Sequence, residues 1–199
     1  GSLVKGVIDK ASLGAEEPGT LIHEILLNYG EEAAHKFLNS FTRMVSTFLK
    51  LRGFSMSYGD IVLSETARDG IEEDLSSADG RVDEIISQFR SGKLQKAPGL
   101  SQEDSLDAYI MDVLSDIRTR TGELASTSLG LDNSAVVMTR TGARGSDLNI
   151  GQMCAALGPQ SLRGKRISRG YLGRPLPHFK RGDLGPAARG FIRSSYMTG

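Results

Sequence analysis

Hydrophobic residues recur at helical spacing in two long segments in the middle of the chain. In the first, from about Ser64 to Arg90, the apolar positions lie three or four residues apart, at Ile71, Leu75, Ala78, Val82, Ile85 and Phe89. The second follows a good N-cap at Ser101, and its apolar positions are Leu106, Tyr109, Ile110, Val113, Leu114, Ile117 and Leu124. Each stripe is typical of one buried face of a helix. Because only a short Gly- and Pro-containing break at 92–99 separates them, we expect the two helices to pack as an antiparallel hairpin.

Shorter helices are predicted before and after this pair. Residues 20–29 form a short helix that ends near Gly30, and a stronger helix runs from Glu31 to Gly53. We expect one face of the stronger helix to pack into a core, and its residues are Phe37, Phe41, Val45 and Phe48. Residues 54–58 alternate as a short strand or an extended loop would, and a further helix is predicted over 148–157. The predicted fold class is therefore mostly α, a long helical hairpin packed with further helices.

The formal net charge of zero conceals two parts of opposite charge. Residues 1–138 carry 13 Lys and Arg against 22 Asp and Glu, whereas residues 139–199 carry 11 against 2. The basic part also holds 11 of the 24 glycines and four of the six prolines, which predicts an irregular segment with short strands. Such a surface suits polyphosphate or a nucleic-acid backbone. Internal pairing of these arginines with the acidic part is the alternative, and the charge counts do not decide between the two.

The composition argues against several classes of function. The single Cys154 lies among apolar residues, so we expect a buried thiol, and it can form neither an internal disulfide nor a Cys-based zinc site. The three histidines lie far apart in sequence, which disfavours a metal site and a nucleophilic triad. No apolar stretch approaches the roughly 20 residues of a membrane span, and no signal-like segment opens the chain, so we expect an intracellular protein without a membrane partner. The opening Gly1-Ser2 suggests a cloning scar and therefore a fragment.

The segment most like a binding site contains Gly142, Arg144, Gly145 and Ser146. Glycines expose backbone N–H groups, a helix is predicted to follow, and an arginine between them can grip phosphate oxygens. The segment lacks the lysine and the spacing of a P-loop. Taken alone, the pattern slightly favours a glycine turn whose arginine makes a structural salt bridge.

Motifs along the whole chain resemble one family. In order they are GVIDK at 6–10, LIHEILLNYG at 21–30, RGFSMSYGD at 52–60, TGARGS at 141–146, LNIGQM at 148–153, GKRI at 164–167, RPLPHF at 174–179 and RGFIRSSYMTG at 189–199. The series closely resembles the largest subunit of archaeal and eukaryotic multisubunit RNA polymerases, and the motif sequences are more similar to archaeal than to nuclear members. Ser57-Tyr58 departs from the family, whose members more often carry Gly-Ile there.

The resemblance implies a position in the polymerase. Residues 1–62 would be the end of the pore region and 63–199 the funnel, with 158–199 an irregular segment that leads to an absent bridge helix. In that family the funnel surrounds the secondary channel, where nucleoside triphosphates enter and a transcript-cleavage factor docks. The implied partners are the second-largest and other subunits, the remainder of the largest subunit and, in the complete enzyme, DNA and RNA. The complete nucleotidyltransferase holds magnesium through aspartates that this sequence lacks, so the piece itself is expected to bind no cofactor and to be inactive. An archaeal source would place it in the cytoplasm with the nucleoid, and a eukaryotic one in the nucleus.

The resemblance also implies roles for individual residues. Arg144 matches a basic residue that faces the triphosphate of the incoming nucleotide, which reverses the preference for a structural turn. A second set stands at positions of the channel lining, where the nuclear enzyme binds the toxin amanitin: Ser115, Arg118, Asn149, Ile150, Gln152 and Gln160. Because Ser115 and Pro159 depart from the nuclear pattern, strong toxin binding is not expected. Lys165 and Arg166 are further candidates in a loop that abuts the bridge helix.

Two alternatives stay open from the residues alone. A stand-alone helical module would bind nucleic acid or another acidic partner through its basic tail, with Arg144, Arg163, Lys165 and Arg166 as the contacts. A purely structural helical hairpin would instead pair its arginines internally.

Overall fold

The computed structural model describes residues 8–14 and 18–199, and these form two compact units. The described residues up to Asp60 and the segment Leu131–Ser146 make up the N-terminal unit, and Ile61–Gly130 with Asp147–Gly199 make up the hairpin unit. The first break lies near the expected boundary at residue 62. The segment Leu131–Ser146 belongs to the N-terminal unit, although the expected division placed it with residues 63–199.

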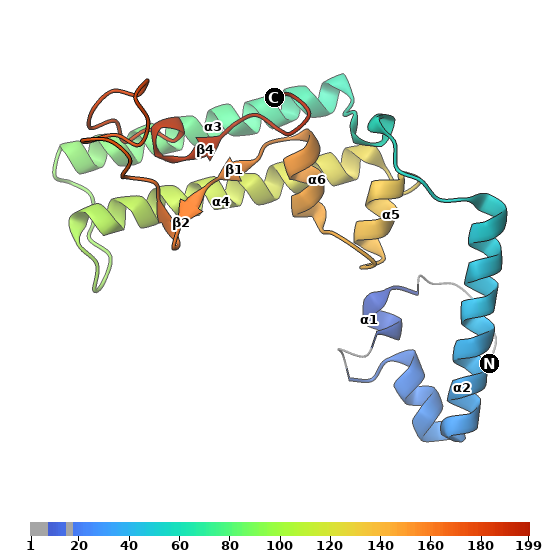
Figure 1. Cartoon of the computed structure of the whole chain (residues 1–199). Helices are drawn as coiled ribbons and strands as arrows, with labels where there is room; N and C mark the ends of the chain where they lie inside the picture. The colour runs from blue at the N-terminus through green and yellow to red at the C-terminus, as the bar shows by residue number, and fades with distance from the viewer. Residues whose placement is uncertain (1–7, 15–17) are drawn as a thin grey trace. The chain divides into compact units, whose positions relative to one another are not determined.

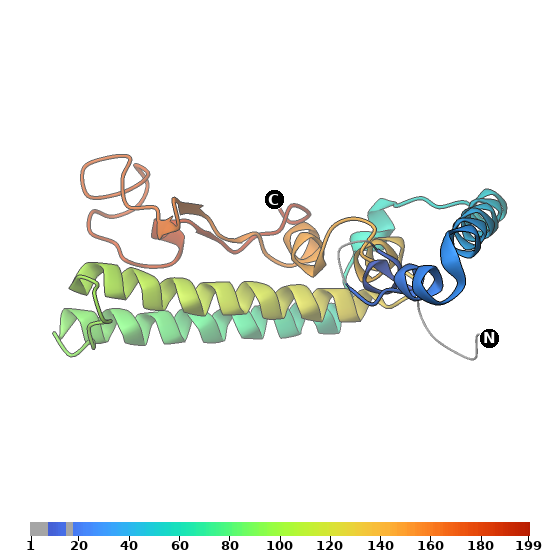
Figure 2. The same ribbon diagram turned by 90° about the horizontal axis from the view of Figure 1, so that it is seen from below.

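Two long antiparallel helices form the frame of the hairpin unit (Figures 1 and 2). These are α3 (Glu65–Arg90) and α4 (Gln102–Leu129). The Ser101 hydroxyl oxygen accepts the Asp104 N–H at 3.0 Å, so the predicted N-cap of the second helix is confirmed. Ser64 caps α3 in the same way by accepting the Ala67 N–H at 3.3 Å. The hairpin is therefore as the hydrophobic pattern predicts.

The apolar stripes face each other in this hairpin, with one local difference. On α3 the buried residues are Ala67, Ile71, Leu75, Ala78, Val82 and Ile86. The stripe was expected to include Ile85 and Phe89, but both are only half-buried. At 3.6 residues a turn, Ile85 and Ile86 lie on either side of the centre line of the stripe, so only the packing against α4 decides which one is buried. On α4 the predicted Tyr109 and Leu124 are likewise half-buried.

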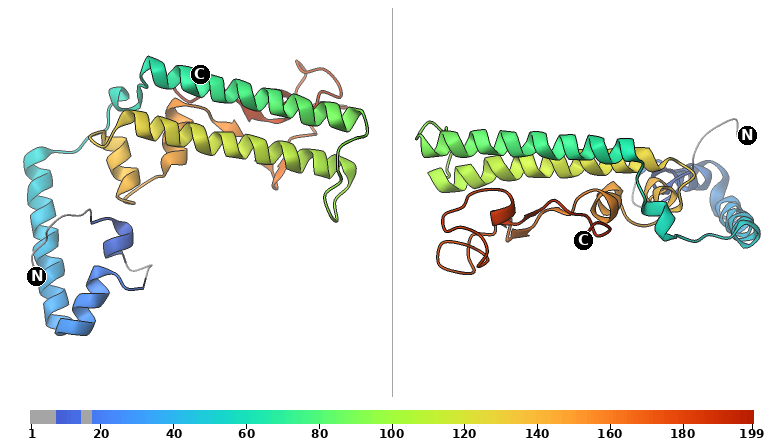
Figure 3. Two further views of the ribbon diagram at one scale, coloured as in Figure 1. Left: turned by 180° about the vertical axis from the view of Figure 1, so that it is seen from behind. Right: turned by 90° about the horizontal axis from the view of Figure 1, so that it is seen from above.

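The tail after residue 146 packs along α4 (Figure 3). It begins with α6 (Asp147–Cys154), and strand β1 (Gly158–Pro159) then pairs antiparallel with β4 (Phe191–Ile192). Strands β2 (Ser161–Leu162) and β3 (Lys165–Arg166) form a small hairpin. Its two turn residues, Arg163 and Gly164, both have positive φ, as the twist of a tight hairpin demands. A 3-10 turn, η2 (Ala187–Arg189), precedes β4. The expected short strands are confirmed.

Helix α6 approaches α4 closely because two glycines meet at the crossing. A Cβ on Gly151 would lie 2.8 Å from the Cα of Gly122, and one on Gly122 would lie 3.1 Å from the carbonyl oxygen of Asp147. Beside this contact Ile150 is fully buried. The backbone-to-backbone approach fixes where the tail begins on the hairpin.

The N-terminal unit contains α1 (Lys10–Leu13), α2 (Leu21–Arg52), α5 (Ser134–Arg140) and most of the 3-10 turn η1 (Tyr58–Ile61). Gly30 inside α2 has φ 82°, so α2 is two helices joined at a kink, as predicted. Residues 54–57 form no strand, and the loop alternative applies.

The aromatic face of α2 was expected to pack into a core, and this expectation is wrong for the described residues. Phe37, Phe41 and Val45 are half-buried, and Phe48 is 53% exposed. Within this helix only Ala34 is buried. The pattern identified the apolar face correctly, but the described part of the unit has no second long helix to cover it.

Candidate functional site

Arg144 lies in the turn that follows α5, between two glycines with left-handed backbone conformations. Gly142 has φ 73° and Gly145 has φ 76°. The Arg144 N–H donates to the Met138 carbonyl oxygen at 3.3 Å, which ties the turn to the helix before it. The Arg144 side chain is exposed and has no hydrogen bond or ion pair with any described residue. The structural salt bridge considered from the sequence is therefore not formed within the described part of the chain.

The six residues expected to line a channel come from three neighbouring segments of the hairpin unit. Ser115 and Arg118 lie on α4, Gln160 follows β1, and the other three lie on α6. Of the α6 residues, Asn149 is exposed, whereas Ile150 is 0% exposed and belongs to the core. The other four residues are half-buried, and they are Ser115, Arg118, Gln152 and Gln160.

Arg118 is held by close packing. A Cβ on Gly158 would lie 2.8 Å from the Cδ of Arg118, so only glycine leaves room for this side chain beside β1. The Arg118 Nε is buried and has no hydrogen-bond partner among the described residues. The side chain is therefore fixed in position while one of its donors stays unused.

Among the described residues, three cations of the basic tail form four ion pairs with the acidic hairpin. The Lys165 Nζ lies 2.7 Å from an Asp104 carboxylate oxygen, and an Arg166 nitrogen lies 3.3 Å from Asp107. Arg193 contacts Glu72 on α3 at 2.6 Å and also pairs with Asp79 and the Ser76 hydroxyl: these partners lie more than a hundred residues before it. Lys165, Arg166 and Arg193 therefore pair with the acidic part of the same chain. For these three residues, internal pairing is the alternative that applies.

Arg166 is the most enclosed of these cations, with 2% of its side chain exposed. Besides Asp107 it donates to the carbonyl oxygens of Leu184 at 2.7 Å and Gly185 at 2.9 Å. Burial lowers the pKa of Arg166 to about 10, and the charge of Arg189 adds to this effect while Asp107 opposes it. The guanidinium therefore remains charged at neutral pH and ties the segment before η2 to α4.

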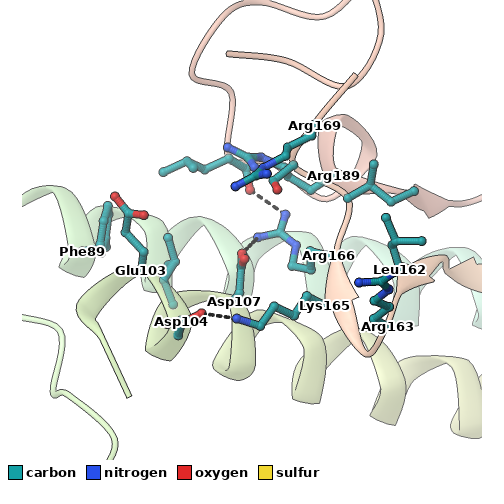
Figure 4. A pocket seen from close by; sticks show the side chains of 14 residues that line it. Phe89, Glu103, Asp104, Asp107, Leu162, Arg163, Lys165, Arg166, Arg169 and Arg189 are labelled. Atoms are coloured by element: carbon teal, nitrogen blue, oxygen red, sulfur yellow. Dashed lines mark hydrogen bonds and ion pairs between the residues drawn. The ribbon is translucent and has the colours of Figure 1, made fainter. Parts of the chain in front are cut away.

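A cavity of about 710 Å³ opens beside these ion pairs (Figure 4). Its charged lining consists of Glu103, Asp104, Asp107, Arg163, Lys165, Arg166, Arg169 and Arg189. Lys165 and Arg166 were identified from the sequence, whereas Arg169, Arg189 and the α4 carboxylates were not. The excess of basic residues in the tail was the only signal for them, and it does not say which ones meet.

Metal and thiol chemistry find little support in the described residues. No group of three or more His, Cys, Asp or Glu side chains among them is placed to hold a metal ion. Cys154 is buried, and burial raises the pKa of its thiol to about 11. In the portion of the chain that the structure describes, no helix has the length and apolarity needed to cross a membrane.

Comparisons with known proteins identify the class to which this arrangement belongs. The model of RNA polymerase Rpb1, domain 3, matches residues 1–61, and that of RNA polymerase Rpb1, domain 4, matches residues 85–192. The chain is 51% identical over 199 residues to the DNA-directed RNA polymerase subunit Rpo1N of Methanocaldococcus jannaschii, covering 100% of this chain and 15% of that one. It is 45% identical over 200 residues to Rpo1N of Methanothermobacter thermautotrophicus, which covers 100% of this chain and 23% of that subunit. It is 43% identical over 199 residues to Rpo1N of Thermoplasma acidophilum, which covers 100% of this chain and 22% of that subunit.

The chain therefore belongs to the Rpb1 family of RNA polymerase largest subunits, with archaeal relatives, and the resemblance seen in its motifs is confirmed. It spans about a fifth of the length of these curated relatives. A helical module unrelated to polymerases is thereby excluded.

Proposed function

We propose that this chain forms the end of the pore and the funnel of an archaeal-type RNA polymerase, where it lines the secondary channel for nucleoside triphosphates. The observation that carries the proposal is the antiparallel pair α3 and α4: all of α4 and the end of α3 lie within the stretch matched by the domain 4 model. A rigid helical hairpin provides a wall that keeps its shape while substrates pass. Its outer end is also an accessible place for a transcript-cleavage factor to dock.

Arg144 is the residue proposed to meet the triphosphate. Its guanidinium is exposed and unpaired with respect to the described residues. Gly142 packs closely against Lys10, whereas Gly145 is exposed. A guanidinium can donate two parallel hydrogen bonds to phosphate oxygens and offset the charge that develops as pyrophosphate leaves. The described residues offer no cluster that fits magnesium, so no step through the metal is assigned to this chain.

The test is single-nucleotide addition by the complete reconstituted polymerase with Arg144→Ala, measured over a range of triphosphate concentrations. We expect kcat/KM to fall roughly hundredfold to thousandfold, as when one donor to a transition-state oxyanion is removed. Arg140→Ala is the matched control, because Arg140 is also exposed and lies four residues earlier, at the end of α5. Equal kinetics for the two variants, with assembly intact, would refute the role of Arg144.

A further inference from the structure

The cavity beside β3 contains more positive charge than its own carboxylates neutralise. Of its lining residues, Lys165 pairs with Asp104 and Arg166 pairs with Asp107. Three arginines then remain, Arg163, Arg169 and Arg189, and they face one remaining carboxylate, Glu103. None of these three guanidinium groups makes an ion pair with a described residue.

Neighbouring backbone satisfies only part of this charge. The Arg189 Nε donates to the Asp183 carbonyl oxygen at 3.0 Å, and one oxygen of the Asp183 carboxylate accepts the Gly185 N–H at 2.9 Å. The Asp183 charge also favours the protonated form of Arg166, so it offsets part of the positive charge. The Arg166 Nε is buried and has no hydrogen-bond partner in the described structure. This nitrogen has almost no accessible surface, so the hydrogen bonds to a ligand come from the exposed Arg169 and the half-buried Arg189.

The arrangement of the arginines suits an anion with several oxygens. Figure 4 shows Arg169 and Arg189 next to Arg166, whereas Arg163 lies apart from them beside Leu162, and Phe89 and Glu103 lie toward the other end of the cavity. Like charges gathered in one cavity repel one another, and a bound anion relieves this repulsion. A carboxylate offers two oxygens, whereas a phosphate group offers three and can be gripped by more than one guanidinium fork. The volume of about 710 Å³ lies within the usual range for small-molecule sites.

We infer that this cavity, lined by Arg163, Arg169 and Arg189, binds a phosphate-bearing anion such as a free diphosphate or the phosphates of a nucleotide. The inference does not depend on the role of Arg144 or on the position of the chain in the channel. It adds a second anion site, in the hairpin unit and built on the tail.

The test follows the reactivity of individual arginines in the assembled polymerase, without magnesium or nucleic acid. Phenylglyoxal modifies accessible guanidinium groups, and peptide mass spectrometry gives the labelling rate at each arginine, so binding elsewhere in the enzyme does not interfere. We expect inorganic pyrophosphate to slow the labelling of Arg169 and Arg189 about fivefold or more, as expected for guanidiniums engaged by phosphate. Arg181 is the internal control, because it is exposed on the same tail but does not line the cavity.

Two variants and two further ligands complete the test. Arg169→Gln should raise the pyrophosphate concentration that half-protects Arg189 by about tenfold, and Arg181→Gln, with the same loss of charge, should leave it unchanged. Adenosine, which lacks phosphate, should give no protection, whereas ATP should protect. A lower half-protecting concentration for ATP than for pyrophosphate would assign a nucleotide, and equal values would assign the phosphates alone. Labelling of Arg169 and Arg189 that pyrophosphate does not change, or equal protection of Arg181, would overturn the inference.

Discussion

The contact between Gly122 on α4 and Gly151 on α6 predicts that alanine at residue 151 destabilises the hairpin unit. A Cβ there would lie 2.8 Å from the Gly122 Cα and 3.4 Å from the Gly122 nitrogen. Carbon atoms pack favourably at about 3.5–4.0 Å, so the two backbones must separate by roughly 1 Å. Both contacting atoms belong to the backbone, so no side chain can rotate to make room.

The expected magnitude follows from two opposing effects. Overpacking of a close contact costs about 1–3 kcal/mol, and replacing a helical glycine by alanine returns about 0.5–1 kcal/mol through helix propensity. Gly151→Ala should therefore lower the free energy of unfolding by roughly 1–2 kcal/mol. Gly80→Ala is the matched control, because Gly80 lies within α3 and a Cβ there meets nothing within 4 Å. It should stabilise the chain by about 0.5–1 kcal/mol.

Urea unfolding followed by circular dichroism compares the two variants, and amide hydrogen exchange over residues 147–157 reports on α6 itself. With a slope of about 2 kcal/mol per molar urea, Gly151→Ala should lower the midpoint by roughly 0.5–1 M, whereas Gly80→Ala should raise it. Exchange in α6 should accelerate only in Gly151→Ala. A midpoint for Gly151→Ala at or above that of the parent chain would refute the argument from close approach.

Three further predictions concern the tail and its partners. Arg166→Met leaves Asp107 without its cation and the carbonyl groups of Leu184 and Gly185 without this donor, so it should destabilise the tail by about 2–4 kcal/mol. Amide hydrogen exchange over residues 158–192 should then become faster, and unchanged exchange would contradict the prediction. The hydrogen bond from Lys165 lowers the pKa of the Asp104 carboxyl and raises that of the Lys165 amine. The stability that the pair contributes is therefore fully present above the ordinary carboxyl pKa of about 3.9 and is lost as pH falls through the lowered pKa of Asp104. At the alkaline end this stability is fully present below the ordinary amine pKa of about 10.4 and is lost as pH rises through the raised pKa of Lys165. In an NMR titration Lys165→Ala should return the pKa of Asp104 toward its ordinary value, and no change would exclude this pairing. Burial raises the pKa of the Cys154 thiol from 9.0 to about 11, so this thiol should react with iodoacetamide at pH 8 about a hundredfold more slowly than a free thiol. It should become reactive when urea unfolds the chain. A fast reaction in the folded chain would show that Cys154 is not buried.

Local features of the fold were predictable from the sequence because their causes are local. Ser101 marks the start of α4 through its own hydroxyl, and Gly30 interrupts α2 through its own backbone conformation. The meeting of Gly122 and Gly151 was not predictable, since neither glycine shows by itself which segment approaches it. The same holds for Arg193, whose partner Glu72 lies 121 residues before it. Interactions between distant segments require the packed structure.

The candidate site illustrates the same limit. Arg144 was found because its neighbours in sequence are glycines that shape the turn around it, so the whole pattern lies within a few residues. The cavity combines Glu103 and Asp107 of α4 with Arg169 and Arg189 of the tail, and no pattern connects these residues along the chain. Charge counting predicted that the two parts could pair, but it could not separate the arginines that do from those that remain available.

The ion pairs specify how the tail lies on the hairpin more than they hold it there. Lys165 is 70% exposed and Arg193 38%, and exposed pairs of this kind contribute at most about 1 kcal/mol each. Burial of apolar residues carries the energy instead, because Ile150, Ala156, Ala188 and Phe191 are nearly inaccessible to solvent. The buried Arg166 favours one register, since sliding β3 along α4 would leave its charge without Asp107. The tail can therefore keep several arginines without an ion pair to any described residue and still hold its place on α4, which is the condition that an anion site on this segment requires.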